Sequence, residues 1–244
     1  MPRNEDKLFT VGDEKPTREP GEVLPSVKTL FHAKKIFLFC EGKTEFQYFS
    51  EYKEDVNNSR LEIIPRYPDH GEREGNDVEQ LAKQLMGSQR KVRISHSGFK
   101  RTIDVEDIDE FFILFDFDKN FKIAGDGLTK YQKARILTEG VGVEFFLSNY
   151  CFEVWILCHF IKPSKRMKKR SLNREIMKCS DWSKYRKGQE GIYLDLRKKL
   201  EIAKENALEL INEEKNMGIS LYSDDSNPFT EIPLLLEKIE KEII

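Results

Sequence analysis

Two aspartates follow an unbroken apolar run in this 244-residue chain. Residues 111–115 are all apolar, and Asp116 and Asp118 come next, separated by one phenylalanine. Such a run predicts a strand buried on both faces, and side chains two positions apart on a strand share a face. Adjacent carboxylates repel one another unless a cation or a shared proton neutralises them. We therefore expect the pair to bind a divalent cation, and oxygen ligands favour Mg²⁺ or Mn²⁺.

A third carboxylate ends another predicted strand. Glu41 and Gly42 follow the strand expected over residues 35–40. If the two strands are neighbours in a parallel sheet, their carboxyl ends meet at the edge where open α/β sheets bind ligands. Glu41 would then join the aspartate pair, and Gly42 would let the backbone turn sharply. Such a trio can hold one or two divalent ions that stabilise charge on a phosphoryl group.

Other residues near these carboxylates are supporting candidates. Lys43 and Lys119 would add positive charge next to the acids. Glu45 falls in the first turn of a helix expected to begin after Thr44, where the helix dipole favours an acid.

A further helix is expected to begin near Ser148 and Asn149. These two residues are interpreted first as a helix cap and second as phosphate contacts through the helix N-terminus. Glu153 stands among apolar residues, where an unpaired charge is costly to bury. It therefore either faces solvent or serves the carboxylate site.

Strands alternate with helices along the first two thirds of the chain. This pattern predicts right-handed βαβ units, a parallel sheet flanked by helices and therefore an α/β fold. We divide the chain into an extended N-terminal arm (1–32), a core (33–160) and a basic helical extension (161–244). The strands are expected at 35–40, 61–65, 111–115 and 143–147, and the helices at 44–52, 77–90 (capped by Asn76 or Asp77), 129–138, 172–177, 193–215 and 230–243.

The net charge of −2 conceals a basic segment. Between Ile161 and Lys204 there are 15 Lys and Arg against 5 Asp and Glu. Such a segment either follows a phosphate backbone or is a solvated basic loop. We assign nucleic-acid binding to its densest part, which contains Lys162, Lys165, Arg166, Lys168, Lys169 and Arg170.

Composition excludes several classes of protein. A 39% hydrophobic and 34% charged chain is typical of a globular protein. No apolar run approaches the roughly 20 residues that cross a bilayer, so we expect a cytoplasmic protein without membrane contact. The four widely spaced cysteines are expected to be thiols, and Cys158-His159 lacks a Cys-x2-Cys partner for zinc.

Longer motifs resemble the RloB-like family within the Toprim superfamily of topoisomerases, primases and OLD-type nucleases. They are Phe39-Cys40-Glu41-Gly42-Lys43-Thr44-Glu45 with Tyr48 and Phe49, then Phe115-Asp116-Phe117-Asp118, then residues 148–160 (SNYCFEVWILCHF), and more weakly residues 226–230 (SNPFT). The resemblance spans roughly residues 34–235. It implies a Toprim-like fold, magnesium bound by Glu41, Asp116 and Asp118, and metal-dependent cleavage of nucleic acid. It also implies a bacterial phage-defence (abortive-infection) setting with an ABC- or AAA-type ATPase encoded nearby.

The chain departs from the Toprim pattern at two positions. Asn120 stands where many Toprim sites have a third acid, and an amide ligates magnesium more weakly than a carboxylate. Asn149-Tyr150 replaces an Asn-Pro that is frequent in the middle motif.

These observations lead us to interpret the chain as a metal-dependent endonuclease acting on DNA or RNA. Asp116 and Asp118 would be metal ligands, and Glu41 a ligand or a general acid/base. The alternative is a non-catalytic Toprim-like sensor or regulatory subunit of an ATPase complex, which Asn120 slightly favours. A primase would need a nucleotide-selecting motif that we do not find.

Overall fold

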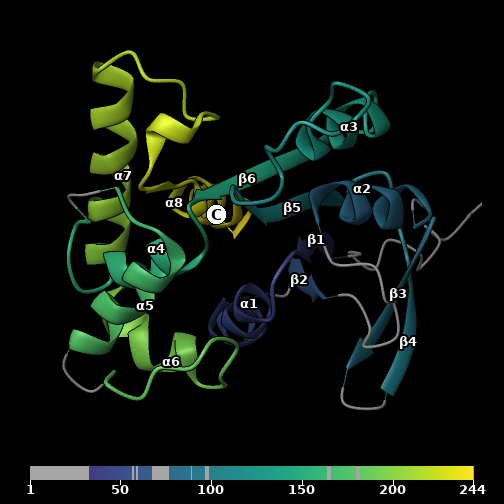
Figure 1. The fold of residues 1–244 in the computed structure, drawn as a ribbon. Coiled ribbons are helices and arrows are strands. Elements are labelled where there is room, and N and C mark those ends of the chain that lie inside the picture. Colours follow the sequence, from purple (N-terminus) through teal and green to yellow (C-terminus); the bar gives the residue numbers. More distant parts are fainter. Residues whose placement is uncertain are drawn as a thin grey trace, which may run out of the picture. The chain divides into compact units, whose positions relative to one another are not determined.

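A five-stranded sheet forms the centre of the fold (Figure 1). The computed structural model describes residues 33–56, 58, 60–67, 77–88, 90–96, 99–163, 166–179 and 182–243. The arm predicted over residues 1–32 lies outside these ranges, as do Asn76 and Lys165. None of the described helices is long and apolar enough to cross a membrane.

The sheet has the strand order β2-β1-β5-β6-β7. Strands β1 (Lys34–Cys40), β2 (Leu61–Arg66), β5 (Glu110–Asp116) and β6 (Val143–Asn149) are parallel, whereas β7 (Phe229–Thr230) pairs antiparallel with β6. The apolar runs of β1 and β5 are buried, as a strand covered on both faces requires. The predicted α/β class is confirmed, with a sheet that is mixed and mostly parallel.

Helices connect the parallel strands. Helix α1 (Lys43–Val56) follows β1, α2 (Val78–Met86) follows β2, and α3 (Lys130–Leu137) precedes β6. The Asp77 side chain caps α2, and Thr129 begins α3 with a capping box, so side chains satisfy backbone N–H groups at both helix starts. Helix α2 packs against β1 and β5.

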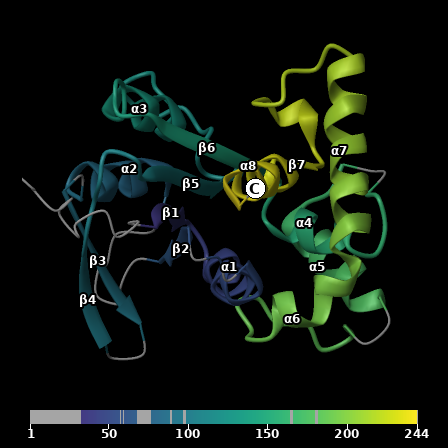
Figure 2. The same cartoon turned by 180° about the vertical axis from the view of Figure 1, so that it is seen from behind.

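Among the residues described in the C-terminal part of the chain, five further α-helices follow (Figure 2). Helix α4 packs against α5 and α7, α6 against α1, and α8 against β6. All four cysteines are free thiols, and three are buried, as expected. The domain boundary at residue 160 stays a prediction. The bounds are α4 (Glu153–Cys158), α5 (Lys169–Lys178), α6 (Ile192–Leu196), α7 (Leu200–Asn216) and α8 (Ile232–Ile243), with short 3-10 helices η1 (Arg197–Lys199) and η2 (Asp224–Ser226).

Three local predictions were wrong or incomplete. Ser148 and Asn149 do not begin a helix, because both continue β6 and pair with β7; α4 begins only at Glu153. The single helix predicted over 193–215 is interrupted by η1. The hairpin of β3 (Lys91–His96) and β4 (Phe99–Asp104), a separate two-stranded sheet, was not predicted.

Candidate functional site

The carboxyl ends of β1 and β5 place Glu41 beside Asp116. The Glu41 backbone N–H donates to the Leu114 carbonyl at 3.0 Å, which extends the ladder by one residue beyond β1. The Glu41 side chain then accepts the backbone N–H of Asp116 at its Oε2 atom, also at 3.0 Å. Both acids are only 7% exposed. The parallel sheet thus brings together two carboxylates that lie 75 residues apart in the sequence.

Asp118 occupies a different position from Asp116. Strand β5 ends at Asp116, so the alternation that put the two side chains on one face does not extend to Asp118. The Asp118 carboxylate accepts the backbone N–H of Lys119, and its Oδ2 atom lies 3.9 Å from the Lys169 ammonium. With a side chain 22% exposed, Asp118 is more open to solvent than Asp116.

Two more acids are buried close to this edge. Glu45, on the first turn of α1, is 1% exposed, and neither of its carboxylate oxygens has a hydrogen-bond partner. Its carboxylate lies against Gly42, where a Cβ atom would collide with it. Glu153, at the start of α4, is fully buried. We call Glu41, Glu45, Asp116 and Glu153 the carboxylate cluster.

Lys187 is the cation that faces the buried end of the cluster. Its ammonium lies 3.0 Å from Glu153 Oε1, and the Tyr185 hydroxyl donates to the same oxygen at 3.3 Å. Neither Lys187 nor Tyr185 was predicted from the sequence. They lie on the connection between α5 and α6, more than 30 residues after Glu153, and no spacing in the sequence ties them to it.

Asn120 holds the Glu41 carboxylate in place. Its fully buried amide donates at 2.7 Å both to Glu41 Oε2 and to the Asp116 carbonyl oxygen, while its Oδ1 atom accepts the Val78 backbone N–H at 3.1 Å. The other Glu41 oxygen is 3.1 Å from the Lys119 ammonium. Asn120 is therefore a structural donor at the site, linking β1, β5 and the N-terminus of α2.

Burial dominates the electrostatics of the cluster. Desolvation raises the pKa of Asp116 well above its ordinary value, and Glu45 and Glu41 raise it further. Desolvation likewise raises the pKa of Glu41, although Lys119 opposes the shift. Burial raises the pKa of Glu45 to about 7, with Lys187 opposing and Glu153 reinforcing the shift. Burial favours the neutral acid at Glu153 too, but Lys187 and the Cys151 thiol outweigh it and lower that pKa.

The remaining candidates lie around the cluster or away from it. Ser148 hydrogen-bonds Thr230 at 2.8 Å, and the Asn149 amide donates to the Ser223 carbonyl and the Ser226 hydroxyl, so these two side chains join β6 to the C-terminal segment. The helix-cap interpretation is therefore wrong for both. Lys43 is exposed at the start of α1.

Part of the basic segment is already neutralised by protein carboxylates. Lys162 lies 2.8 Å from Glu209 and 2.6 Å from Glu213, and Arg166 pairs with Asp224 and Asp225. Lys168 and Arg170 are exposed, and Lys169 faces Asp118. Lys165 lies outside the described residues.

The geometry of the carboxylate cluster bears on metal binding. Among the described residues, no three His, Cys, Asp or Glu side chains converge as a preformed metal-binding group. The donor chemistry nevertheless fits a hard divalent cation, because the cluster offers only oxygen atoms and Glu45 has two buried oxygens without a partner. Glu41, Glu45 and Asp116, with Asp118 on the solvent side, are the residues that would hold such an ion.

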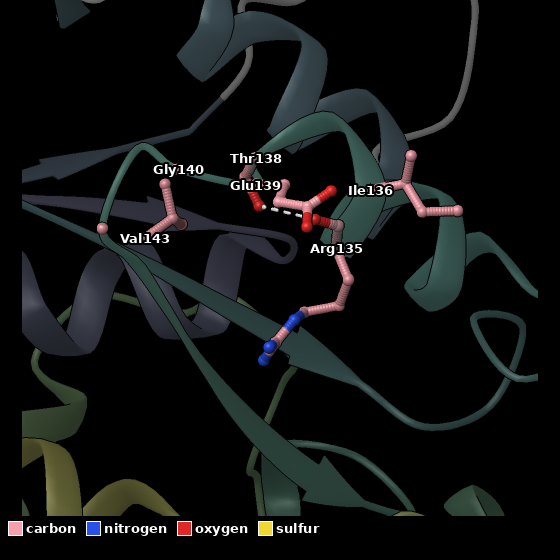
Figure 3. A pocket seen from close by; sticks show the side chains of 7 residues that line it. Arg135, Ile136, Thr138, Glu139, Gly140 and Val143 are labelled. Atoms are coloured by element: carbon pink, nitrogen blue, oxygen red, sulfur yellow. Dashed lines mark hydrogen bonds between the residues drawn. The ribbon is translucent and has the colours of Figure 1, made fainter.

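Two surface cavities lie elsewhere. One, of about 400 Å³, is lined by residues such as Arg135, Thr138 and Gly140 between α3 and β6 (Figure 3). Another, of about 450 Å³, is lined by residues that include Phe160, Cys179 and Lys199. Neither contains a member of the carboxylate cluster.

Comparison with known proteins identifies the family. The family model described as RloB-like protein matches residues 36–239, so the chain belongs to the RloB-like family. The match contains the whole carboxylate cluster together with Asp118, Asn120 and Lys187. No curated protein and no solved structure shows significant similarity to the chain.

The pKa of Glu45 predicts how stability depends on pH. The pKa of Glu45 is raised from 4.5 to about 7 in the folded state, so between these two pH values the unfolded state has lost a proton that the folded state still holds. The folded state therefore loses stability as pH rises through this range. In EDTA, wild type should lose on the order of 3 kcal/mol of unfolding free energy relative to Glu45→Gln between about pH 5 and about pH 8. Urea unfolding of both proteins across this range tests it, and parallel pH profiles would contradict it.

Replacing Asn120 tests whether it is a donor or a weak metal ligand. Asn120→Asp removes the hydrogen bond to Glu41 and adds a buried negative charge, so it should lower the melting temperature in EDTA and should not tighten Mn²⁺ binding. Asn120→Ala should cost about 1–3 kcal/mol, the usual cost of leaving buried polar groups unpaired. Asn206, whose amide donates to the Cys158 carbonyl at 2.7 Å, supplies the control: Asn206→Ala should leave Mn²⁺ affinity unchanged. Tighter Mn²⁺ binding by Asn120→Asp would instead indicate that residue 120 contacts the bound metal ion.

Proposed function

We propose that this RloB-like protein is a divalent-metal-dependent endonuclease that hydrolyses phosphodiester bonds in nucleic acid. The supporting observation is the carboxylate cluster, in which four acids are buried together at the carboxyl edge of the sheet. Uncompensated buried acids are strongly destabilising, and a divalent cation that shares their oxygens removes this cost. Such a cation is also the usual means of neutralising charge during phosphoryl transfer.

Mg²⁺ or Mn²⁺ is the proposed cofactor, with Glu41, Asp116 and Asp118 as ligands and Glu45 as a further oxygen donor. Once bound, the ion would stabilise negative charge on the phosphoryl oxygens. The Asn120 amide and the Asp116 backbone N–H fix one oxygen of Glu41, so this carboxylate presents a defined direction to its ligand.

The protein side chains supply proton transfer and positive charge. A general acid or base works best when its pKa lies near the working pH, and Glu45, with a pKa of about 7 in the metal-free cluster, would meet that condition only where the ion leaves its oxygens uncoordinated. Glu41 remains a ligand or an acid/base group. Lys119 and Lys187 place ammonium groups next to the acids, where they reduce the repulsion of a phosphate.

The biological setting is proposed from the family. A role in bacterial antiviral defence, with an ABC- or AAA-type ATPase as partner, is what the RloB-like resemblance implies. The carboxylate cluster does not distinguish DNA from RNA. An ion held by these carboxylates would stabilise charge on the phosphate group, which both nucleic acids contain.

One observation favours the non-catalytic alternative. Lys119 and Lys187 already neutralise Glu41 and Glu153 without an ion, so the cluster could serve a sensor or regulatory subunit of an ATPase complex. Only an assay of cleavage separates this possibility from the nuclease.

Cleavage of labelled DNA and RNA in Mg²⁺ and in Mn²⁺ tests the proposal. Wild type should cut at least one of them, and Glu41→Gln, which keeps the shape of the side chain, should reduce the rate by at least about 10²-fold, also at saturating Mn²⁺. Glu144→Gln is the control, because Glu144 lies on β6 in a surface pair with Lys238. Absence of cleavage by wild type, even with the neighbouring ATPase and ATP, would overturn the nuclease and favour the regulatory subunit.

A further inference from the structure

The connection that carries Lys187 is held against helix α1 and against Glu153 of the carboxylate cluster. We call residues 182–191 the 182–191 loop. The Gly188 backbone N–H donates to the Thr44 hydroxyl at 3.0 Å, and the Gly191 backbone N–H donates to the Glu51 carboxylate at 2.6 Å. Together with the Lys187–Glu153 ion pair, these contacts fix the loop to α1 and to the start of α4.

Three exposed cations belong to this fixed surface. Lys184 and Arg186 lie on the loop, and Lys43 lies at the start of α1, where the carbons of its side chain are close enough to Gly188 to crowd an added Cβ atom at 3.0–3.2 Å. Gly188 has a φ of +70°, so its backbone favours glycine as well.

These cations differ from Lys162 and Arg166 of the basic segment. Within the part of the chain that the structure describes, no carboxylate forms an ion pair with Lys43, Lys184 or Arg186. Lys162 and Arg166, by contrast, each pair with two acids. A cation that already has a carboxylate partner must lose it before binding a phosphate, whereas an unpaired one only exchanges water.

We propose that Lys43, Lys184 and Arg186 form a binding surface for the phosphate backbone of nucleic acid at the rim of the carboxylate cluster. Four acids in one place repel a polyanion, so a substrate needs cations held at a fixed position beside them. The loop supplies such cations because the contacts that hold Lys187 also hold its neighbours. Contacts of this kind bind without reading sequence. The inference rests on nucleic acid being the substrate of the proposed function.

A binding assay without hydrolysis tests this surface. The probes are fluorescent oligonucleotides of single- and double-stranded DNA and RNA, titrated with full-length protein in EDTA over a range of salt concentrations. The triple variant Lys43→Ala, Lys184→Ala, Arg186→Ala should bind the best probe at least about tenfold more weakly, and the slope of log affinity against log salt should fall by about 0.7 to 0.9 for each lost contact.

The control removes the same charge elsewhere. Arg174, Lys198 and Lys215 are exposed on α5, η1 and α7, and their triple replacement by alanine should keep near wild-type affinity and slope. Melting temperatures confirm that both triple variants are folded. Equal losses in the two triples, an unchanged salt slope in the first, or a wild type that binds none of the probes would overturn the proposal. Since the assay needs no cleavage, an inactive wild type that still binds would overturn the nuclease alone.

Discussion

Burial of four acids at one sheet edge is the constraint on which the rest of this structure depends. Each carboxylate loses its hydration, and each raises the cost of ionising the next, as the raised pKa values of Asp116, Glu41 and Glu45 express. Among the four acids of the cluster, only Glu153 has a lowered pKa, because the ammonium of Lys187 is 3.0 Å away from its carboxylate. The cluster therefore combines two acids that have an ammonium partner, Glu41 and Glu153, with two, Glu45 and Asp116, that need a proton or a cation.

The surrounding elements are arranged around this requirement. Parallel pairing of β1 with β5 sets Glu41 against the backbone of Asp116, and Asn120 then ties both to the N-terminus of α2. The 182–191 loop brings a lysine to Glu153 from a segment that is remote in the sequence. Several hydrogen bonds and ion pairs thus orient the clustered acids, which is expected of a binding or catalytic site more than of a structural core.

The predictable parts of the fold are those encoded by local apolar runs. Residues 36–40 and 111–115 marked β1 and β5, and from them the positions of Glu41 and Asp116 at one edge could be inferred. The roles of Lys187 and Tyr185 could not be inferred from the sequence, because only tertiary packing brings these residues to Glu153. Ser148 and Asn149 were assigned to a helix start because serine and asparagine are typical N-caps, but β6 continues through them, paired with Asp116 of β5 and with the two residues of β7. From the sequence, Asn120 was expected to be a weak magnesium ligand in place of a third acid. In the structure its amide donates a hydrogen bond to Glu41.

We propose that the carboxylate cluster binds a divalent cation and that Glu45 gives up its proton when the ion binds. Calorimetric titration of Mn²⁺ into metal-free protein, in two buffers with different heats of protonation near pH 6.5, measures the protons released on binding. A ligand with a pKa of about 7 is mostly protonated there, so Glu45 should release at least about half a proton, and Glu45→Gln should lower the total release by about that amount. Mn²⁺ binding without proton release, or no Mn²⁺ binding at all, would contradict the account.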